Sequence, residues 1–218
     1  MLKALLERYR RRRFAWLFFS LLLTIGGHPA LERLAPAVNP LGLLLAVNLL
    51  AAIASVARER WTWVLLALGV AFAAIRGLQA ALGITALLPL SETLWVTAGL
   101  LAMAATVRHA MRPGAVDAER IFAALDVYLL AGLVFGVAYW VLEQTWPGPF
   151  GAPSARHLDL AHAIYFSFVT IATLGYGDIV PASEPARGLA ILEAVGGQMY
   201  LAVLVARLVS LYSRQADR

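Results

Sequence analysis

The chain has no cysteine, and only 14% of its 218 residues are charged. Without cysteine there is neither a disulfide framework nor a thiolate metal site, and the redox compartment stays open. Ordinary soluble domains carry roughly a quarter charged residues, so the low charge argues against a soluble globular protein. Apolar side chains make up 61% of the residues and raise the mean hydropathy to +0.75. This composition predicts a protein embedded in a membrane.

The basic residues lie in the gaps between apolar runs. The 18 Lys and Arg outnumber the 13 Asp and Glu, and the net charge of +5 alone would also suit a nucleic-acid partner. No basic stripe with interleaved aromatic residues is present, so no nucleic-acid partner is predicted. The sequence also lacks a nucleophile elbow, a Walker loop and a cluster of metal ligands. We therefore predict neither an enzyme nor a bound cofactor.

Six apolar runs are each long enough to cross a bilayer, which takes about 20 helical residues. A shorter run, 159–171, would extend only about 20 Å as a helix, so it predicts a re-entrant helix. The first run also resembles a secretory signal with Ala35-Pro36-Ala37 as a poor cleavage site, but we favour a transmembrane helix weakened near Gly26, Gly27 and Pro29. The six predicted spans are residues 14–34, 38–57, 61–82, 84–107, 121–142 and 187–212.

Lys and Arg are distributed unequally between the two sides of this topology. By the positive-inside rule both termini are cytoplasmic, and residues 143–186 lie outside. The expected location is the cell membrane, which is the inner membrane in a bacterium, with a multi-pass topology and lipid contacts. The inner side then holds Lys3, Arg8, Arg10 to Arg13, Arg58, Arg60, Arg108, Arg112, Arg120, Arg214 and Arg218, and the outer side holds Arg33, Arg156 and Arg187.

A break between the fourth and fifth runs divides the chain. Pro113 and Gly114 interrupt the helical pattern, and Asp117 is a plausible cap for the next helix. The predicted parts are a four-helix unit at 1–107, a cytoplasmic linker at 108–120, a unit of helix, re-entrant helix, loop and helix at 121–212, and a cytoplasmic tail at 213–218. The tail is too short for a cytoplasmic ligand-binding domain.

Glycines at alternate positions follow the short apolar run, in Thr173-Leu174-Gly175-Tyr176-Gly177-Asp178. A strand points successive carbonyl oxygens to opposite sides, whereas residues with positive φ, which glycine adopts readily, turn them to one side. Carbonyl oxygens that face one axis replace the hydration shell of an ion. Thr173 can add its hydroxyl, and Tyr176 can turn its ring away from the axis and bond to a neighbouring short helix. The motif therefore predicts an ion-selectivity filter.

The segment Thr170-Ile171-Ala172-Thr173-Leu174-Gly175-Tyr176-Gly177-Asp178 resembles the signature of the tetrameric potassium-channel family, with leucine where TVGYG has valine. The resemblance covers residues 121–212 and points to prokaryotic six-transmembrane members, whereas the first four runs match only in number and position. It implies an all-α integral membrane fold with six transmembrane helices, a re-entrant pore helix and a homotetrameric pore that conducts K⁺ passively. The implied K⁺ ligands are backbone oxygens of Thr173, Leu174, Gly175 and Tyr176, supported by Thr170, Gly177, Asp178 and Glu193.

Ionisable residues within the spans are costly in a membrane and are candidates for function. Glu193 lies near the level of the filter, where it is either a structural acid bonded to hydroxyls of the short helix or a proton-sensitive support. Asp126 and Arg207 lie toward the cytoplasmic end, where they either pair near an inner gate or reach the interface separately. Gly196 and Gly197 fall in the middle of the last span. Close packing explains them, but Gly197, nineteen residues after Asp178, also resembles the gating hinge of the family.

The fourth run, 84–107, contains no arginine. Voltage sensors need several, since each charge moved yields only about 2.3 kcal/mol per 100 mV. The four-helix unit thus resembles a voltage-sensor domain without gating charges, and voltage gating is not expected. Arg76 and Glu92 are predicted to form a structural salt bridge.

Other polar residues carry weaker signals. His157 and His162 are either surface groups or respond to external pH, and Asn48 has no evident role. Two alternative functions stay open beside the potassium channel. One is a cation channel of looser selectivity, and the other is a non-conducting regulatory or assembly subunit.

Overall fold

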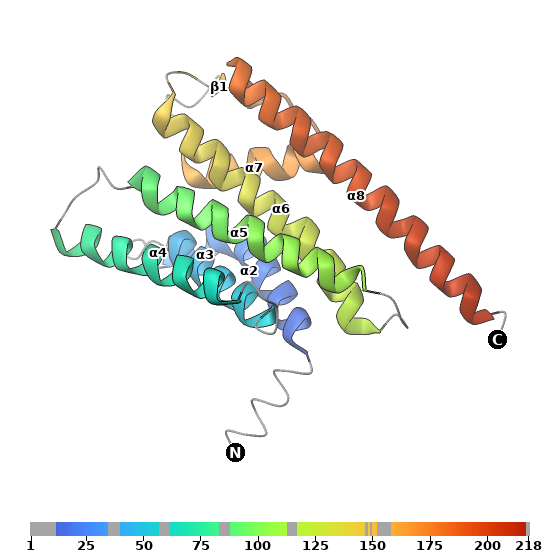
Figure 1. The fold of residues 1–218 in the computed structure, drawn as a ribbon. Helices are drawn as coiled ribbons and strands as arrows, with labels where there is room; N and C mark the ends of the chain where they lie inside the picture. Colours follow the sequence, from blue (N-terminus) through green and yellow to red (C-terminus); the bar gives the residue numbers. More distant parts are fainter. Residues whose placement is uncertain are drawn as a thin grey trace. The chain divides into compact units, whose positions relative to one another are not determined.

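The computed structural model describes residues 12–34, 40–56, 62–82, 88–112, 117–146, 148, 150–151 and 158–216. Among them are seven helices and a pair of two-residue strands (Figure 1). A helix occupies each of the apolar runs, so the predicted positions of the helices are confirmed. In chain order the elements are α2 (Arg13–Leu34), α3 (Pro40–Ser55), α4 (Thr62–Leu82), α5 (Leu88–Ala110), α6 (Ala118–Thr145), β1 (Phe150–Gly151), α7 (Leu160–Ile171), β2 (Val180–Pro181) and α8 (Glu184–Ala216).

Three of the described helices are long and apolar enough to cross a membrane. They are Leu90–Ala110 in α5, Ala118–Thr145, which is α6, and Glu184–Ser210 in α8. Shorter apolar helices are Leu41–Ser55, Trp63–Gln79 and Leu160–Ile171. This all-helical architecture fits an integral membrane protein. The topology of six spans stays a prediction.

The chain forms two compact units. The first consists of Met1–Ala73 and Thr97–Leu130, and the second of Ala74–Val96 and Ala131–Arg218. The division of the sequence at 108–120 stays a prediction about domains. The segment after the fifth apolar run, which carries the filter motif, lies wholly in the second unit.

A polar cluster joins α2 to α3 in the first unit. Asn48, whose side chain is 1% exposed, accepts a hydrogen bond from Ser20 Oγ at 2.6 Å and donates one to Thr24 Oγ1 at 2.6 Å. Most of the other buried side chains of these two helices are apolar, among them Leu17, Leu21, Leu45 and Leu49. Because a buried amide is costly without partners, this pairing favours one register of α2 against α3. Asn48 therefore has a structural role that its sequence context did not reveal.

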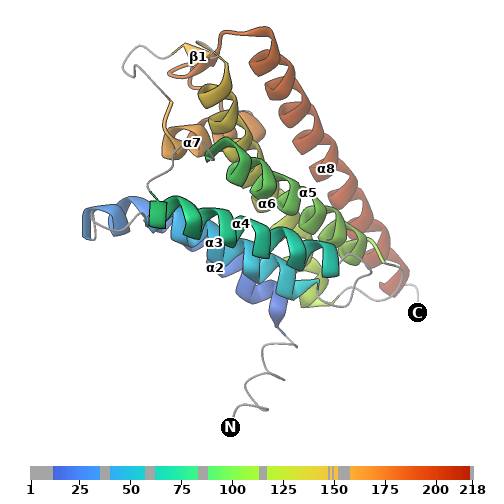
Figure 2. The ribbon, with the colours of Figure 1, turned by 60° about the vertical axis from the view of Figure 1, so that its left-hand side comes forward.

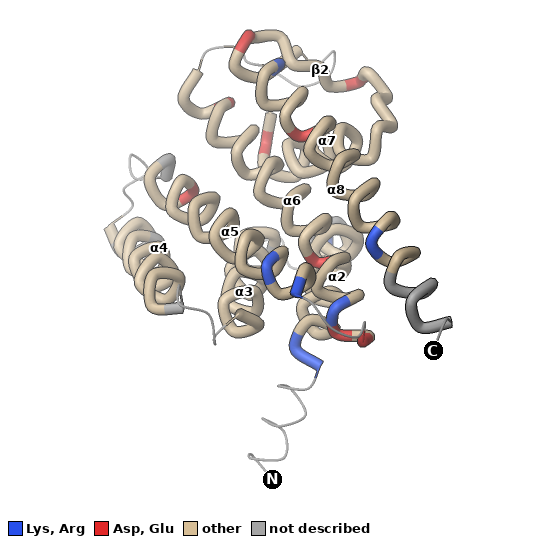
Figure 3. Tube along the Cα trace, turned by 45° about the vertical axis from the view of Figure 1, so that its right-hand side comes forward, with Lys and Arg blue, Asp and Glu red and all other residues tan. Residues whose placement is uncertain are grey.

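Arg33 lies in the last turn of α2, whereas the other described Arg residues of the first unit gather at the opposite end (Figure 3). There the start of α2 meets the end of α5 and the start of α6. The ring of Phe14 stacks on His109 with centroids 4.6 Å apart, and the Phe14 amide donates to Glu119 Oε2 at 3.2 Å. Arg13 lies over the same phenyl ring, 4.9 Å from its centroid. These contacts hold three helix ends together on the side that the sequence predicts to be cytoplasmic.

In the second unit, α7 lies beside both α6 and α8, as Figures 1 and 2 show from two directions. Two glycines one turn apart on α6 allow the close approach. A Cβ at Gly132 would lie 2.5 Å from Phe168 Cζ, and one at Gly136 would lie 2.7 Å from Ile164 Cα. Small residues four apart let helix backbones pack closely in a membrane. The α6 surface is thus shaped to receive α7.

An aromatic cluster lies beside β1 and β2 at one end of the second unit. Tyr139 packs edge-on against Phe150 and Phe166, with centroid distances of 5.5 Å and 4.9 Å, and these two rings lie 5.3 Å apart. Leu158 and Ile179 are buried in the same cluster. Phe150 belongs to β1, which pairs antiparallel with β2 through Phe150↔Pro181 and Gly151↔Val180. The segments before and after α7 are thereby tied to each other, a pairing that the sequence did not predict.

We predict that Gly136→Ala destabilises the protein by about 1–3 kcal/mol, the usual cost of overpacking. The new methyl group would meet the Cα of Ile164, and a backbone atom cannot rotate away, so α7 must shift. Thermal unfolding in detergent, followed by near-UV circular dichroism, measures the effect. Gly26→Ala is the matched control, because no atom lies within 4 Å of its added Cβ. Equal midpoints for the two variants would contradict the close packing of α6 and α7.

Candidate functional site

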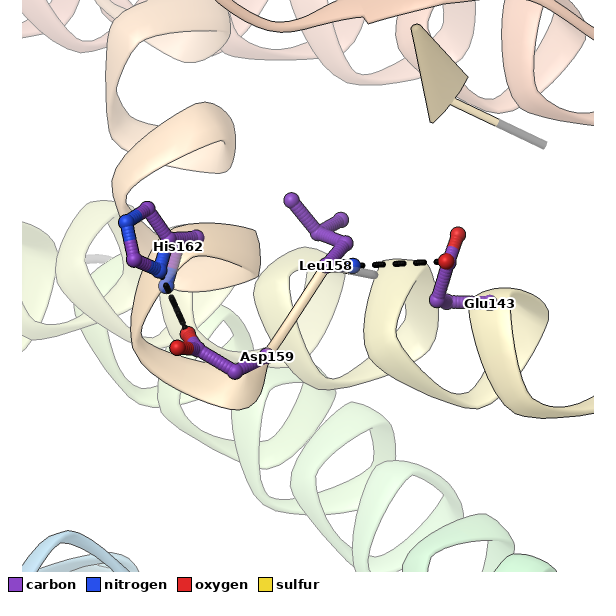
Figure 4. A network of polar contacts seen from close by, with 4 residues as sticks. All are labelled: Glu143, Leu158, Asp159 and His162. Atoms are coloured by element: carbon purple, nitrogen blue, oxygen red, sulfur yellow. Dashed lines mark hydrogen bonds and ion pairs between the residues drawn. The ribbon is translucent and has the colours of Figure 1, made fainter. Parts of the chain in front are cut away.

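The start of α7 is held by two carboxylates (Figure 4). Asp159 caps the helix by accepting a hydrogen bond from the His162 amide at 2.8 Å, and the His162 ring Nδ1 lies 2.8 Å from the same oxygen. The Leu158 amide donates to Glu143 Oε1 of α6 at 3.3 Å. Capping side chains satisfy amides that the first helical turn leaves without partners. His162 is thus engaged with Asp159, whereas the His157 of the sequence analysis lies outside the described residues.

Three alternate residues after α7 have positive φ. They are Thr173 at 57°, Gly175 at 56° and Gly177 at 78°, while Leu174 and Tyr176 between them keep ordinary negative values. The glycine spacing predicts this conformation at 175 and 177. Thr173 is the unexpected member, because a β-branched residue in this region is strained by about 1–3 kcal/mol. Such strain persists only where the surrounding structure imposes it.

The end of α7 passes directly into this turn through backbone hydrogen bonds. The Thr173 amide donates to Thr170 O at 3.0 Å, and the Leu174 amide donates to Val169 O at 2.9 Å. The carbonyl of Ile171 accepts a further hydrogen bond from the Gln198 amide group of α8 at 3.3 Å. The helix end and the turn therefore form one hydrogen-bonded piece, and α8 holds that piece by a side chain.

Asp178 follows the turn and is attached to α7. Its Oδ2 accepts a hydrogen bond from the Tyr165 hydroxyl at 2.8 Å, and its Oδ1 accepts one from the Ile179 amide at 3.0 Å. The hydrogen bond between the Tyr165 hydroxyl and Asp178 raises the pKa of Tyr165 above its ordinary value, so the hydroxyl stays a donor at neutral pH. Tyr176, which the sequence analysis expected to brace the turn, is 67% exposed in the single chain. Its bond to a neighbouring short helix stays a prediction.

Glu193 connects α8 to both α6 and α7. Its side chain is 0% exposed. One carboxyl oxygen accepts a hydrogen bond from the Tyr139 hydroxyl at 2.6 Å, and the other makes a short hydrogen bond with the Ser167 hydroxyl. Ser167 Oγ also lies 2.6 Å from the carbonyl oxygen of Gly132. The predicted contact with hydroxyls of the short helix is present through Ser167, while the role of Glu193 as a filter support stays a prediction.

Gly196 and Gly197 differ in their surroundings. A Cβ at Gly197 would lie 2.5 Å from Ile171 Cγ1, whereas one at Gly196 would have no atom within 4 Å. The geometry thus provides a packing reason for Gly197 alone. Helix α8 is continuous through both glycines. The hinge stays a prediction.

Two predicted ion pairs stay untested. Asp126 is 0% exposed, and neither of its carboxylate oxygens has a hydrogen-bond partner among the described residues. Its pairing with Arg207, which is itself engaged in an interaction, stays a prediction. Glu92 is buried, but the side chain of Arg76 lies outside the described ones, so their salt bridge stays a prediction as well.

Several residues that build the site carried no signal in the sequence analysis. A G-x-x-x-G search of the fifth run would have found Gly132 and Gly136, because that spacing is a known helix-packing motif. Tyr139, Ser167 and Gln198 have no such signal. They are ordinary polar residues on helices, and only the packing of three helices brings them together.

Together these features define a class of protein, a helical integral membrane protein whose membrane-length helices α6 and α8 flank a short helix and a turn of alternating φ. The sequence model described as "Ion channel" matches residues 124–214, which contain nearly all of this arrangement. Protein LctB of Bacillus caldotenax is 31% identical over 96 residues, which cover 42% of this chain and 71% of LctB. The chain belongs to this ion channel family.

Two other relatives match over a similar number of residues. Two pore potassium channel c of Oryza sativa subsp. japonica is 34% identical over 84 residues, which cover 38% of this chain and 18% of that protein. Inward rectifier potassium channel Kirbac3.1 of Paramagnetospirillum magnetotacticum is 33% identical over 92 residues, which cover 40% of this chain and 28% of that protein. The chain thus spans less than a third of either relative. No solved structure matches the chain.

Proposed function

We propose that the chain is one subunit of a potassium-selective channel that conducts K⁺ passively through a pore of four identical subunits. The observation that carries the proposal is the alternation of positive φ at Thr173, Gly175 and Gly177. This alternation turns successive carbonyls of one chain to the same side, and potassium filters are built from rings of such carbonyls. Two of the relatives are named as potassium channels.

In this proposal the ion ligands are the backbone oxygens of Thr173, Leu174, Gly175 and Tyr176. One chain supplies one filter segment, so a central pore needs four copies. Exposure of Leu174 and Tyr176 in the single chain is compatible with neighbours that cover them. Thr170, Gly177, Asp178 and Glu193 support the filter.

The proposed topology has six spans in the cell membrane, the inner membrane of a bacterium, with both termini cytoplasmic. Support comes from the described Arg residues of the first unit, which gather at one end of it except for Arg33 in the last turn of α2 (Figure 3). The segment that carries the filter then enters from the outer side. The end of α7, with its partial negative charge, points toward the membrane centre, where it favours a cation.

Potassium selectivity is the first test of this function. Purified protein in liposomes should give K⁺ flux, and bi-ionic reversal potentials should favour K⁺ over Na⁺. Tyr176→Asp should lower that ratio, because the bracing ring is lost, whereas Tyr176→Phe keeps the ring and should stay closer to the native ratio. Selectivity that survives Tyr176→Asp would contradict the bracing. Equal permeability to both ions in the native chain would indicate a cation channel of looser selectivity, and no flux would indicate a non-conducting subunit.

Voltage dependence is expected to be weak or absent. Between Leu88 and Val107, α5 carries no arginine, so the gating charge that steep voltage dependence needs is missing. Conductance of the reconstituted protein, recorded from hyperpolarised to depolarised potentials, should change little. Steep opening that disappears in Arg76→Gln would overturn this prediction and the structural role of Arg76.

Gating through a bend at Gly197 is tested by two neighbouring substitutions. If Gly197 is a hinge, Gly197→Ala stiffens α8, and open probability should fall while ion selectivity stays unchanged, because the closed state is expected to have the straighter helix. Gly196→Ala adds the same methyl group to the same helix with free space around it, so it reports stiffening without the contact with Ile171. Single-channel recording measures both quantities. Unaltered open probability in assembled Gly197→Ala protein would remove the hinge and leave close packing.

A further inference from the structure

The buried network around Glu193 contains more hydrogen bonds than its hydroxyl groups can supply. Four groups follow one another in it, namely Tyr139 Oη, the Glu193 carboxyl, Ser167 Oγ and Gly132 O, and three short oxygen–oxygen contacts join them. Each contact needs one proton. Tyr139 and Ser167 provide one proton each, and the Gly132 carbonyl provides none.

The missing proton has a single source among the four groups. If Glu193 is a carboxylic acid, every contact is satisfied in one direction, because Tyr139 donates to Glu193, Glu193 donates to Ser167, and Ser167 donates to Gly132 O. If Glu193 is a carboxylate, Ser167 has one proton for two acceptor oxygens, Glu193 Oε1 and Gly132 O. One of these two short oxygen–oxygen contacts is then left with no proton between its atoms. The observed positions of the oxygens fit the acid.

The surroundings of Glu193 also favour the neutral form. No Lys, Arg or His side chain contacts it among the described residues, and a buried carboxylate without such a partner is costly. The other titratable groups of the packed elements are engaged elsewhere or distant along their helices. On α6 they are Glu143 with Leu158 and, in the first half of the helix, Glu119, Arg120, Asp126 and Tyr128. On α7 they are His162 with Asp159 and Tyr165 with Asp178, and on α8 they are Glu184 with Arg187, Tyr200 and Arg207.

We infer that Glu193 is a positioning residue that works as a protonated acid, fixing α7 and hence the filter through the proton it donates to Ser167. The inference rests on the proposed potassium-channel function for its effect on conduction.

Ser167 lies one helical turn before Ile171, the last residue of α7, and Gly197 and Gln198 contact Ile171 from the next turn of α8. Loss of the proton removes one bond of the network and leaves an unpaired charge beside the helix. The filter should then be held less firmly at high pH than at neutral pH.

Glu193→Gln is the decisive variant, because its amide donates to Ser167 and its carbonyl accepts from Tyr139, as the protonated acid does. The first measurement is the infrared difference spectrum between native and Glu193→Gln protein in liposomes at neutral pH. The native protein should show the carbonyl stretch of a buried carboxylic acid that the variant lacks. Absence of that band would overturn the inference whether or not the protein conducts.

The second measurement is the K⁺/Na⁺ permeability ratio as pH rises. The native ratio should fall by roughly five- to tenfold, the factor that loss of one hydrogen bond gives, while Glu193→Gln keeps a high, flat ratio. Glu184→Gln, an exposed acid on the same helix, should retain the native pH profile. A native pH response in Glu193→Gln, or low selectivity at every pH in that variant, would overturn the inference. If native protein passes no K⁺ at all, the proposed function fails, and the infrared band still decides the protonation of Glu193.

Discussion

The Ser167 hydroxyl lies where three helices meet, and the placement of the candidate filter depends on that meeting. Helix α7 has only 12 residues, too few to cross a bilayer, and in the proposed topology its end lies inside the membrane. Irregular backbone at that depth is tolerated only where protein covers it or a water-filled cavity receives it. The hydrogen bonds of Ser167 with Gly132 O on α6 and with Glu193 on α8, together with the Gln198 bond to Ile171 O, attach α7 to both long neighbours.

Close glycine contacts and hydrogen bonds act on both the α6 side and the α8 side of α7. On the α6 side Gly132 and Gly136 remove side chains so that Phe168 and Ile164 can approach the backbone. On the α8 side Glu193, Gly197 and Gln198 face α7 from successive turns, and they provide an acid, a space and an amide donor. Neither set alone determines the height of α7 along its neighbours. Glycine contacts define how close the helices lie, and the directional hydrogen bonds define the register.

The sequence was sufficient to predict the helices, because long apolar runs leave few alternatives in a membrane, and the glycine spacing correctly indicated positive φ at 175 and 177. It was not sufficient for contacts between helices. Four residues that make such contacts are unremarkable in their own runs, namely Asn48, Tyr139, Ser167 and Gln198. Their partners lie on other helices, 24 to 54 residues away in the sequence. Strain at Thr173 was likewise hidden, since threonine does not favour that conformation and only the attachment on both sides of the turn imposes it. Glu193 was recognised by its charge, and a bond to a hydroxyl of the short helix was expected, but neither Ser167 nor Tyr139 was identified as its partner.

Thr173 is the residue of the turn whose positive φ would suit glycine better than the residue present. Glycine would adopt a φ of 57° without steric conflict, so the backbone alone would be better served by a run of three alternating glycines. The conformational preference of threonine therefore does not explain its presence at this position, and what distinguishes it from glycine is its side chain. A hydroxyl and a methyl group are what it adds, and they stand at the inner edge of the motif, where the turn leaves the helix. Chemistry at that edge, rather than backbone geometry, is the property that natural variation at position 173 would be expected to preserve.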